Sequence, residues 1–298
     1  MSTFDERLEK LIKDGLQEDV GDGDHSTLSC IPPDAKGKAV LKIKQVGILA
    51  GMQVAEKIFH HQEAGCIFKA LKKDGDEMKP GEMAFEVEAS IHTILQCERL
   101  VLNCVQRMSG IATLTRQYVN MLYGYKTQLL DTRKTIPNFR VLEKEAVRIG
   151  GGVNHRFGLF DMIMLKDNHI DFCGSIEKAI EKAYNYVQEK KPGLIIEVET
   201  RSIDDVKTVI AVGKEKVSRI MLDNFTPEQV IQAMAIIPED FETEASGGIN
   251  LDSIEEYAKT GVNYVSVGAL IHQAKSLDMS LDAVPVQKVS EEGKINEK

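Results

Sequence analysis

From residue 125 onward, short apolar runs alternate with helical segments, and this alternation restricts the fold more than any other feature. Two of the helical segments begin with favourable caps, because Ser202 has Asp205 three positions later and Thr226 precedes Pro227. Repeated strand–helix alternation indicates a parallel sheet, and this many units favours a (β/α) barrel or a close variant. The apolar runs occupy residues 128–131, 162–165, 194–198, 219–222, 241–245 and 263–267.

The first part of the chain has a mixed α and β pattern. Leu8, Ile12 and Leu16 recur at helical spacing, and residues 39–43 alternate as in a half-exposed strand. A turn at residues 79–82 precedes a second strand. A helix is expected over about 93–108, with a break at Ser109-Gly110 and a second helix to about Leu122.

Composition and charge exclude several classes of protein. The 298 residues are 43% hydrophobic and carry a net charge of −9, so nucleic acid and anionic membranes are poor partners. Neither a membrane-length apolar run nor a signal-peptide pattern occurs, and we expect a cytoplasmic protein. The five cysteines show no Cys-x-x-Cys spacing, which argues against a disulfide framework and a zinc ribbon.

Four cations follow or precede the predicted barrel strands. Arg133 and Lys134 come after the first strand, while Arg156 and Lys166 flank the second. In such barrels the active site lies at the carboxyl ends of the strands, so we expect these side chains to share one anion-binding cleft. The alternative is a set of ordinary surface salt bridges.

Glycine turns follow the last two strands. Ser246-Gly247-Gly248 leaves one strand and precedes a helix, and Gly268 has the equivalent place one unit later. Successive backbone N–H groups at such turns bind phosphate, although a lone Gly-Gly is often only a turn.

Three carboxylates complete the predicted rim. Glu197 and Glu199 share a face of their strand, and Asp223 ends the next strand. Glu199 and Asp223 are candidates to hold a hydrated Mg²⁺, the only expected cofactor. The alternative is that they pair with nearby cations.

Several of these residues belong to longer motifs. In chain order these are Glu18-Asp19, Glu98-Arg99, residues 109–113, Thr132-Arg133-Lys134-Thr135, Lys144, residues 150–156, Lys166-Asp167-Asn168-His169, Glu197-Val198-Glu199, Leu222-Asp223-Asn224 and residues 244–249. Together they resemble the quinolinate phosphoribosyltransferases, also called nicotinate-nucleotide pyrophosphorylases, up to about residue 281.

The resemblance implies an α/β fold with an N-terminal α/β sandwich (residues 1–115), an incomplete (β/α) barrel (116–272) and a C-terminal segment (273–298) that returns to the N-terminal domain and ends in a frayed tail. It also implies a homodimer, or a higher oligomer, in which Arg99 enters the partner's site. The substrates would be quinolinate and phosphoribosyl pyrophosphate.

The resemblance assigns roles residue by residue. Quinolinate and the phosphates would be held by Thr132, Arg133, Lys134, His155, Arg156 and Lys166, with Lys134, Lys166, Glu199 and Asp223 as catalytic residues. Glu199 and Asp223 would serve the ribose hydroxyls and Mg²⁺, and Ser246, Gly247, Gly248 and Gly268 the 5′-phosphate. The chain departs from the family at Ile271 and Gln273, where hydroxyl residues are expected, and at His25 and Ser26.

The implied reaction joins the pyridine nitrogen to C1 of the sugar, with loss of CO2 and pyrophosphate, in the de novo synthesis of NAD. Three alternatives remain open at this point. They are a lyase that forms an imine on Lys166, a barrel that binds anions without catalysis, and a related transferase that acts on nicotinate or another ring.

Overall fold

The computed structural model describes residues 3–284, which fall into two compact units. The first holds the described residues up to 106 and from 277 onward, and the second holds residues 107–276. The predicted boundaries at 115/116 and 272/273 both fall inside the second unit, and the predicted frayed tail lies outside the described residues.

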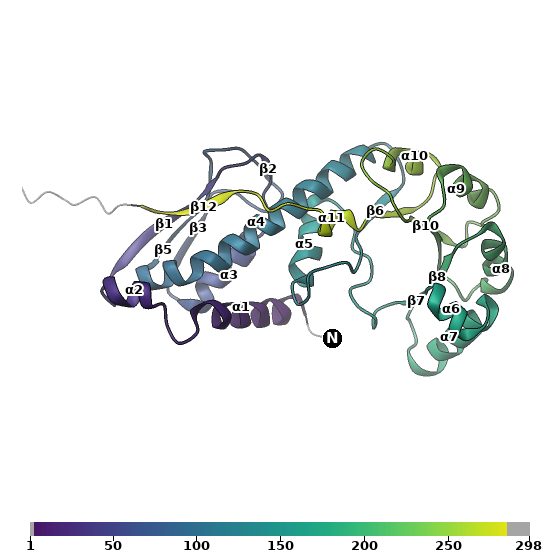
Figure 1. Cartoon of the computed structure of the whole chain (residues 1–298), viewed down its shortest axis with the longest axis horizontal. Coiled ribbons are helices and arrows are strands. Elements are labelled where there is room, and N and C mark those ends of the chain that lie inside the picture. Colours follow the sequence, from purple (N-terminus) through teal and green to yellow (C-terminus); the bar gives the residue numbers. More distant parts are fainter. Residues whose placement is uncertain (1–2, 285–298) are drawn as a thin grey trace, which may run out of the picture. The chain divides into compact units, whose positions relative to one another are not determined.

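The first unit is built around a four-stranded antiparallel sheet in the order β12-β1-β5-β3, with a small β2-β4 ribbon (Figure 1). Phe59 and Phe85 are fully buried in its core, with ring centroids 6.0 Å apart. Its elements are α1 (Phe4–Val20), α2 (His25–Cys30), β1 (Lys36–Ile43), β2 (Gly47–Ile48), α3 (Met52–Gln62), β3 (Ile67–Ala70), β4 (Glu77–Met78), β5 (Met83–Ser90), the start of α4 and β12 (Met279–Val284).

One sequence prediction is wrong. The expected break at Ser109-Gly110 is absent, since α4 (Ile91–Met121) is a single continuous helix (Figure 1). Gly110 instead permits close packing, because a Cβ there would lie only 2.0 Å from the carbonyl oxygen of Lys275. The glycine is explained by a tertiary contact that residue order does not reveal.

The second unit contains a six-stranded parallel sheet in the order β6-β11-β10-β9-β8-β7. Its elements are β6 (Gln128–Leu130), α5 (Arg140–Gly150), β7 (Ile163–Leu165), α6 (Asp167–Cys173), α7 (Ile176–Lys190), β8 (Ile196–Thr200), α8 (Ile203–Gly213), β9 (Arg219–Asp223), α9 (Pro227–Met234), β10 (Glu242–Ser246), α10 (Ile254–Lys259), β11 (Tyr264–Ser266) and α11 (Ala269–His272).

The parallel sheet does not close on itself. Strands β6 and β7 are its two ends, and among residues 3–284 only an isolated bridge between Leu130 and Val153 extends it beyond β6. The predicted fold class, an N-terminal α/β unit with an incomplete (β/α) barrel, is confirmed. Within residues 3–284, no helix is both long and apolar enough to cross a membrane.

The cap predictions for the barrel helices are also confirmed. The Ser202 side chain accepts the N–H of Asp205 at the start of α8. Thr226 and Gln229 form a reciprocal capping box at the start of α9, with Pro227 at the first position. Such caps fix where each strand-to-helix loop ends, and these loops carry the site.

Candidate active site

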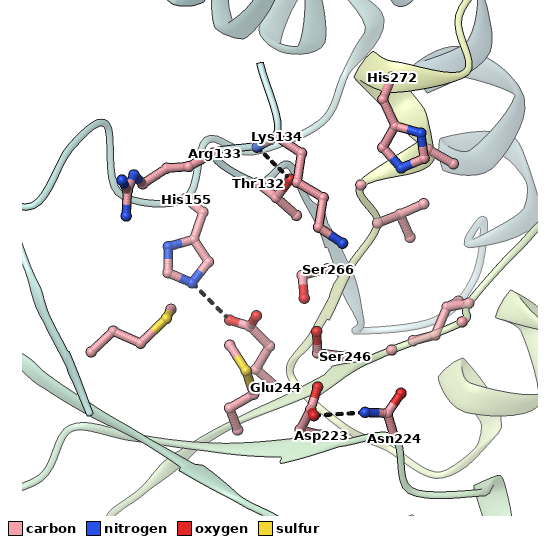
Figure 2. Close-up of a pocket in the computed structure, with 18 of the residues that line it drawn as sticks. Thr132, Arg133, Lys134, His155, Asp223, Asn224, Glu244, Ser246, Ser266 and His272 are labelled. Carbon is pink, nitrogen blue, oxygen red and sulfur yellow. Dashed lines mark hydrogen bonds and ion pairs between the residues drawn. The ribbon is translucent and has the colours of Figure 1, made fainter. Parts of the chain in front are cut away.

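A cavity of about 750 Å³ lies at the carboxyl ends of the barrel strands. The predicted residues that line it are Thr132, Arg133, Lys134, His155, Arg156, Lys166, Asp223, Ser246, Gly247, Gly248 and Gly268. Figure 2 labels six of them, which are Thr132, Arg133, Lys134, His155, Asp223 and Ser246. The structure therefore brings together the four predicted cations and both glycine turns.

The loop after β6 presents the first cations. The Thr132 hydroxyl accepts the N–H of Lys134 (3.1 Å; Figure 2). This hydrogen bond fixes the turn that carries the Arg133 and Lys134 side chains. Lys134 lies against Gly268 of the opposite rim, since a Cβ on that glycine would be 3.0 Å from Lys134 Cδ. Arg133 Nε is buried and has no hydrogen-bond partner among residues 3–284. A buried guanidinium N–H without an acceptor favours an anionic ligand at this place.

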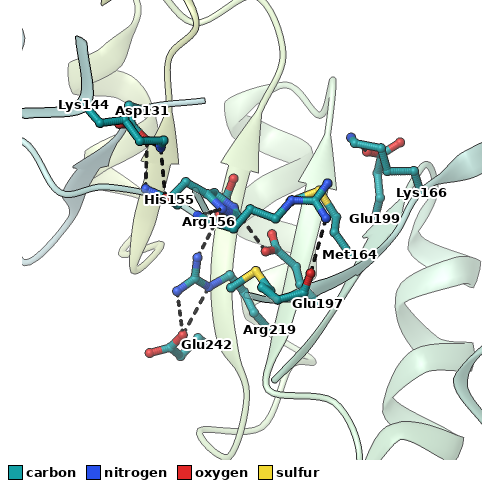
Figure 3. A network of polar contacts seen from close by, with 12 residues as sticks. Asp131, Lys144, His155, Arg156, Met164, Lys166, Glu197, Glu199, Arg219 and Glu242 are labelled. Carbon is teal, nitrogen blue, oxygen red and sulfur yellow. Dashed lines mark hydrogen bonds and ion pairs between the residues drawn. The ribbon is translucent and has the colours of Figure 1, made fainter. Parts of the chain in front are cut away.

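A buried ion pair links the loop after β6 to the loop that carries His155. Lys144 of α5 donates to Asp131 Oδ1 (2.5 Å) and to the carbonyl of His155 (3.0 Å), and the His155 N–H donates to the same Oδ1 (2.8 Å) (Figure 3). With its amide turned so that Nδ2 faces inward, Asn154 donates to Asp131 Oδ2 (2.8 Å). This network holds both loops, and with them Arg133 and Arg156, in one arrangement.

His155 lies between two buried carboxylates. Its Nε2 is 3.2 Å from Glu197 Oε2 and 3.2 Å from Glu244 Oε2, and Arg219 NH1 donates to Glu244 (3.1 Å). Burial lowers the pKa of His155, but the two carboxylates outweigh it and raise that pKa to about 9. Burial, reinforced by the charge of Glu244, raises the pKa of Glu197 to about 7.

The other nitrogen of the His155 ring opposes this charging. The Arg156 N–H donates to Nδ1 (2.7 Å), so a second proton on Nδ1 would break that contact. Whenever the ring is neutral, the Nδ1 contact sets the tautomer, with the proton on Nε2, between the carboxylates. The ring thereby fixes the backbone at Arg156, whose guanidinium contacts the carbonyl of Met162 (3.4 Å).

The two predicted metal ligands are in different situations. Glu199 does not line the cavity, and it pairs with Lys166 Nζ (Figure 3). Asp223 lines the cavity and accepts from Asn224 Nδ2 (2.7 Å; Figure 2). Burial, and next the charge of Glu199, raise the pKa of Asp223. A cation beside the two carboxylates would offset their mutual repulsion, and carboxylate oxygens are ligands of hydrated Mg²⁺, so this donor set fits the ion.

The glycine turn after β10 has a backbone that other residues rarely adopt. Gly247 and Gly248 have φ angles of 100° and 66°. A Cβ at Gly247 would lie 2.2 Å from Asn224 Oδ1, so only glycine fits there. The Asn224 N–H also donates to the carbonyl of Ser246 (2.7 Å), which joins the ends of β9 and β10. The turn is a suitable nest for a phosphate.

Two predicted site residues, Glu199 and Arg99, do not line the cavity, and several cavity residues were not predicted. Arg99 is exposed on the part of α4 that belongs to the first unit and does not line the cavity. Some of the cavity residues that the sequence analysis did not predict belong to the motifs named there or lie beside the predicted glycines. That position in the sequence was the signal that could have identified them. The missed lining residues are Met164, Met221, Asn224, Glu244, Ile249, Asn250, Ser266, Val267, Ala269, His272 and Gln273.

Comparison with known proteins decides the family. The model of the quinolinate phosphoribosyl transferase C-terminal domain matches residues 111–282, and the model of the N-terminal domain matches residues 24–109. The chain belongs to the quinolinate phosphoribosyltransferase family. The resemblance drawn from the motifs is thus confirmed.

Relatives of this transferase family match over nearly the whole chain. The probable nicotinate-nucleotide pyrophosphorylase [carboxylating] of Bacillus subtilis is 43% identical over 276 residues, which cover 93% of each chain. Quinolinate phosphoribosyltransferase [decarboxylating] 1b of Nicotiana tabacum is 40% identical over 292 residues, or 94% of this chain and 82% of the relative. The crystal structure of NadC from Streptococcus pyogenes has a TM-score of 0.86 at 40% identity and covers 93% of this chain and 95% of that one.

Proposed function

We propose that this transferase joins quinolinate to the phosphoribosyl group of phosphoribosyl pyrophosphate and releases CO2 and pyrophosphate, giving nicotinate mononucleotide for NAD synthesis. The observation that carries the proposal is the single cavity that holds Arg133, Lys134, Arg156 and Lys166 beside two glycine turns. A doubly negative ring and a phosphosugar together match this set of donors.

The cations and the glycine turns would bind different parts of the two substrates. Arg133 offers a buried N–H that has no hydrogen-bond partner among residues 3–284, and Arg156 lines the same cavity, so these guanidinium groups suit the two ring carboxylates. Ser246 and the glycines that follow it suit the 5′-phosphate. This division places the ring nitrogen next to the sugar between the two ends of the cavity.

The residues support a reaction without a protein nucleophile. As pyrophosphate leaves C1 of the sugar, positive charge develops there, and the ring nitrogen attacks C1. Lys134 and Lys166 offset the negative charge on the departing group. The quaternised nitrogen then stabilises the carbanion left at C2 when that carboxylate departs as CO2, and the carbanion takes up a proton. Glu199 and Asp223 would hold a hydrated Mg²⁺, whose contribution when bound is to offset charge on the leaving pyrophosphate.

A homodimer in which Arg99 completes the partner's cavity is the second part of the proposal. An exposed arginine on α4 is available for this contact. Mixing inactive Arg99→Ala and Arg133→Ala chains, with exchange of subunits, should restore about a quarter of the sites, because each mixed two-fold dimer contains one intact cavity. No recovery from subunits that do exchange would contradict the shared site. The predicted cytoplasmic location also belongs to the proposal, and cell fractionation tests it.

The deciding experiment is incubation of the protein with quinolinate, phosphoribosyl pyrophosphate and Mg²⁺, with nicotinate mononucleotide, CO2 and pyrophosphate measured together. A parallel reaction with nicotinate separates this transferase from one that acts on a ring with a single carboxylate. Product from nicotinate at a rate equal to or above that from quinolinate would overturn the substrate assignment. Tight binding of both substrates without pyrophosphate release would favour the non-catalytic barrel.

A further inference from the structure

We infer that Arg107 and Glu143 are positioning residues that hold α11 and the Gly268 turn against Lys134, and so determine how tightly the cavity binds the phosphorylated substrate. The inference rests on the proposed function and adds two residues from outside the cavity. Neither residue lines the cavity.

Arg107 binds the carboxyl-terminal end of α11 directly. Its NH2 donates to the carbonyl of Ile271 (2.7 Å) and its NH1 to the carbonyl of Ala274 (2.7 Å). The helix has only one turn, and Ile271, where the family is expected to have a hydroxyl, is buried and apolar. The Ile271 carbonyl also accepts the Ala274 N–H (3.3 Å), so the guanidinium adds two donors at the point where the helix's own N–H groups run out, and it fixes the position of α11.

Glu143 connects Arg107 to the opposite rim of the cavity. This fully buried carboxylate of α5 accepts from Arg107 Nε (3.1 Å) and NH2 (2.8 Å) with Oε1, and from the N–H of Ile136 (2.9 Å) with Oε2. Ile136 lies in the loop that begins at Asp131 and presents Arg133 and Lys134. One ion pair thus joins that loop to α11.

The two rims meet where the anion would bind. Gly268 precedes α11, and a Cβ there would lie 3.0 Å from Lys134 Cδ and 3.2 Å from His272 Nε2. A shift of α11 by a fraction of an ångström would either press on Lys134 or separate it from the Gly268 backbone. Since geometry errors near 1 Å can reduce function by about 100-fold, this spacing is expected to govern phosphate binding.

Loss of Arg107 should mainly weaken binding of the phosphorylated substrate beside Gly268. The loop after β6 retains its anchor at Asp131, which is bound to Lys144 and to the His155 N–H, and Glu143 can still accept from Ile136. For α11, by contrast, Arg107 provides the side-chain donors to the carbonyls of Ile271 and Ala274. Binding of the ring carboxylates at Arg133 and Arg156 should therefore change little.

The test compares Arg107→Met and Arg107→Lys with Arg148→Met as the matched control. Arg148 lies on α5, the helix that carries Glu143, and pairs with Glu145 at the surface, so its loss removes an exposed arginine ion pair from that helix. KM is measured for each substrate by steady-state kinetics, and Kd for phosphoribosyl pyrophosphate with Mg²⁺ by calorimetry. Circular dichroism and Tm report folding.

For Arg107→Met we expect KM and Kd for phosphoribosyl pyrophosphate to rise about 10-fold or more, with KM for quinolinate within about 3-fold. Arg107→Lys should fall between this variant and the parent, because an ammonium cannot reach all three acceptors in the geometry of the fork. If Arg107→Met does not fold, Arg107→Lys decides the question by the same comparison, which is the rise in KM for phosphoribosyl pyrophosphate against the rise in KM for quinolinate. The control should match the parent.

Equal rises in both KM values, or an unchanged Kd for phosphoribosyl pyrophosphate, would overturn the inference, because a purely structural role would not separate the two substrates. If the parent protein makes no product, the proposed function fails instead. Calorimetry with phosphoribosyl pyrophosphate would then still decide whether Arg107 controls its binding.

Discussion

Replacement of Lys144 by methionine tests the buried network that supports the site. The Lys144 side chain is 4% exposed and its partner Asp131 is fully buried. Methionine has a similar length and volume, so the change removes an ammonium group and leaves almost no cavity. What remains is a buried carboxylate that has lost its counter-charge, and the carbonyl of His155, which loses its donor Lys144 Nζ.

The expected loss in the free energy of unfolding follows from those contacts. Breaking a buried ion pair by removal of one partner costs about 3–5 kcal/mol. Asp131 keeps the N–H of His155 and the amide of Asn154, so we expect the lower end, about 3 kcal/mol. That is a large share of the roughly 5–15 kcal/mol that stabilises an ordinary domain.

The loss should depend on pH in a defined direction. Burial already raises the pKa of Asp131 above its ordinary value, and Lys144 opposes that rise. Without Lys144 the folded-state pKa rises further, so the folded protein binds a proton that the unfolded chain releases. Stability of the variant then falls as pH rises through the interval between the unfolded and folded pKa values, and the deficit is larger at neutral than at acidic pH.

Urea denaturation of the parent and Lys144→Met at about pH 5 and about pH 8 measures this deficit. The double variant Asp131→Asn/Lys144→Met should recover much of the loss, because it removes the uncompensated charge. Lys259→Met, which changes an exposed lysine of α10, is the control. A Lys144→Met deficit below about 0.5 kcal/mol at neutral pH, the range of ordinary surface changes, would refute the reasoning.

The remaining predictions concern the substrate cations, the metal and the first unit. Arg133→Ala and Arg156→Ala should each lower kcat/KM for quinolinate by about 100- to 1000-fold, the equivalent of roughly 3–4 kcal/mol, and near-normal turnover at limiting quinolinate would remove the basis of the anion site. Chelation of Mg²⁺ should abolish turnover and added Mg²⁺ should restore it, whereas full activity after exhaustive chelation would dismiss the metal. Hydrogen bonds from Lys36 and from the Ser90 N–H lower the pKa of Glu63 to about 2, so the stability that this carboxylate contributes is present above its ordinary pKa and is lost as pH falls toward 2. The free energy of unfolding of Glu63→Gln, measured at decreasing pH, should therefore fall less than that of the parent as pH drops from the ordinary carboxylate pKa toward 2. The same fall in both proteins would contradict a stabilising role for the Glu63 carboxylate.

Sequence alone determined the order of elements and the kind of chemistry at the rim. The alternation of apolar runs and helices predicted the parallel sheet, because hydrophobic periodicity is a local property that each segment carries by itself. Since the carboxyl ends of parallel strands meet at one edge, the sequence alone assigns residues that follow those strands, such as Arg133 and Lys166, to one region.

Tertiary structure alone decided which buried charges pair. Arg107 contacts a carbonyl 164 positions away, and no periodicity or motif connects it with Ile271. Gly110 was interpreted as a helix break, yet it is the point where α4 approaches the backbone of Lys275. Likewise, Glu244 pairs with His155 and Arg219, which lie far from it in the sequence. A buried charge is tolerated only when a partner is brought to it, and that partner is chosen by the packing of distant elements rather than by the residues beside it in the chain.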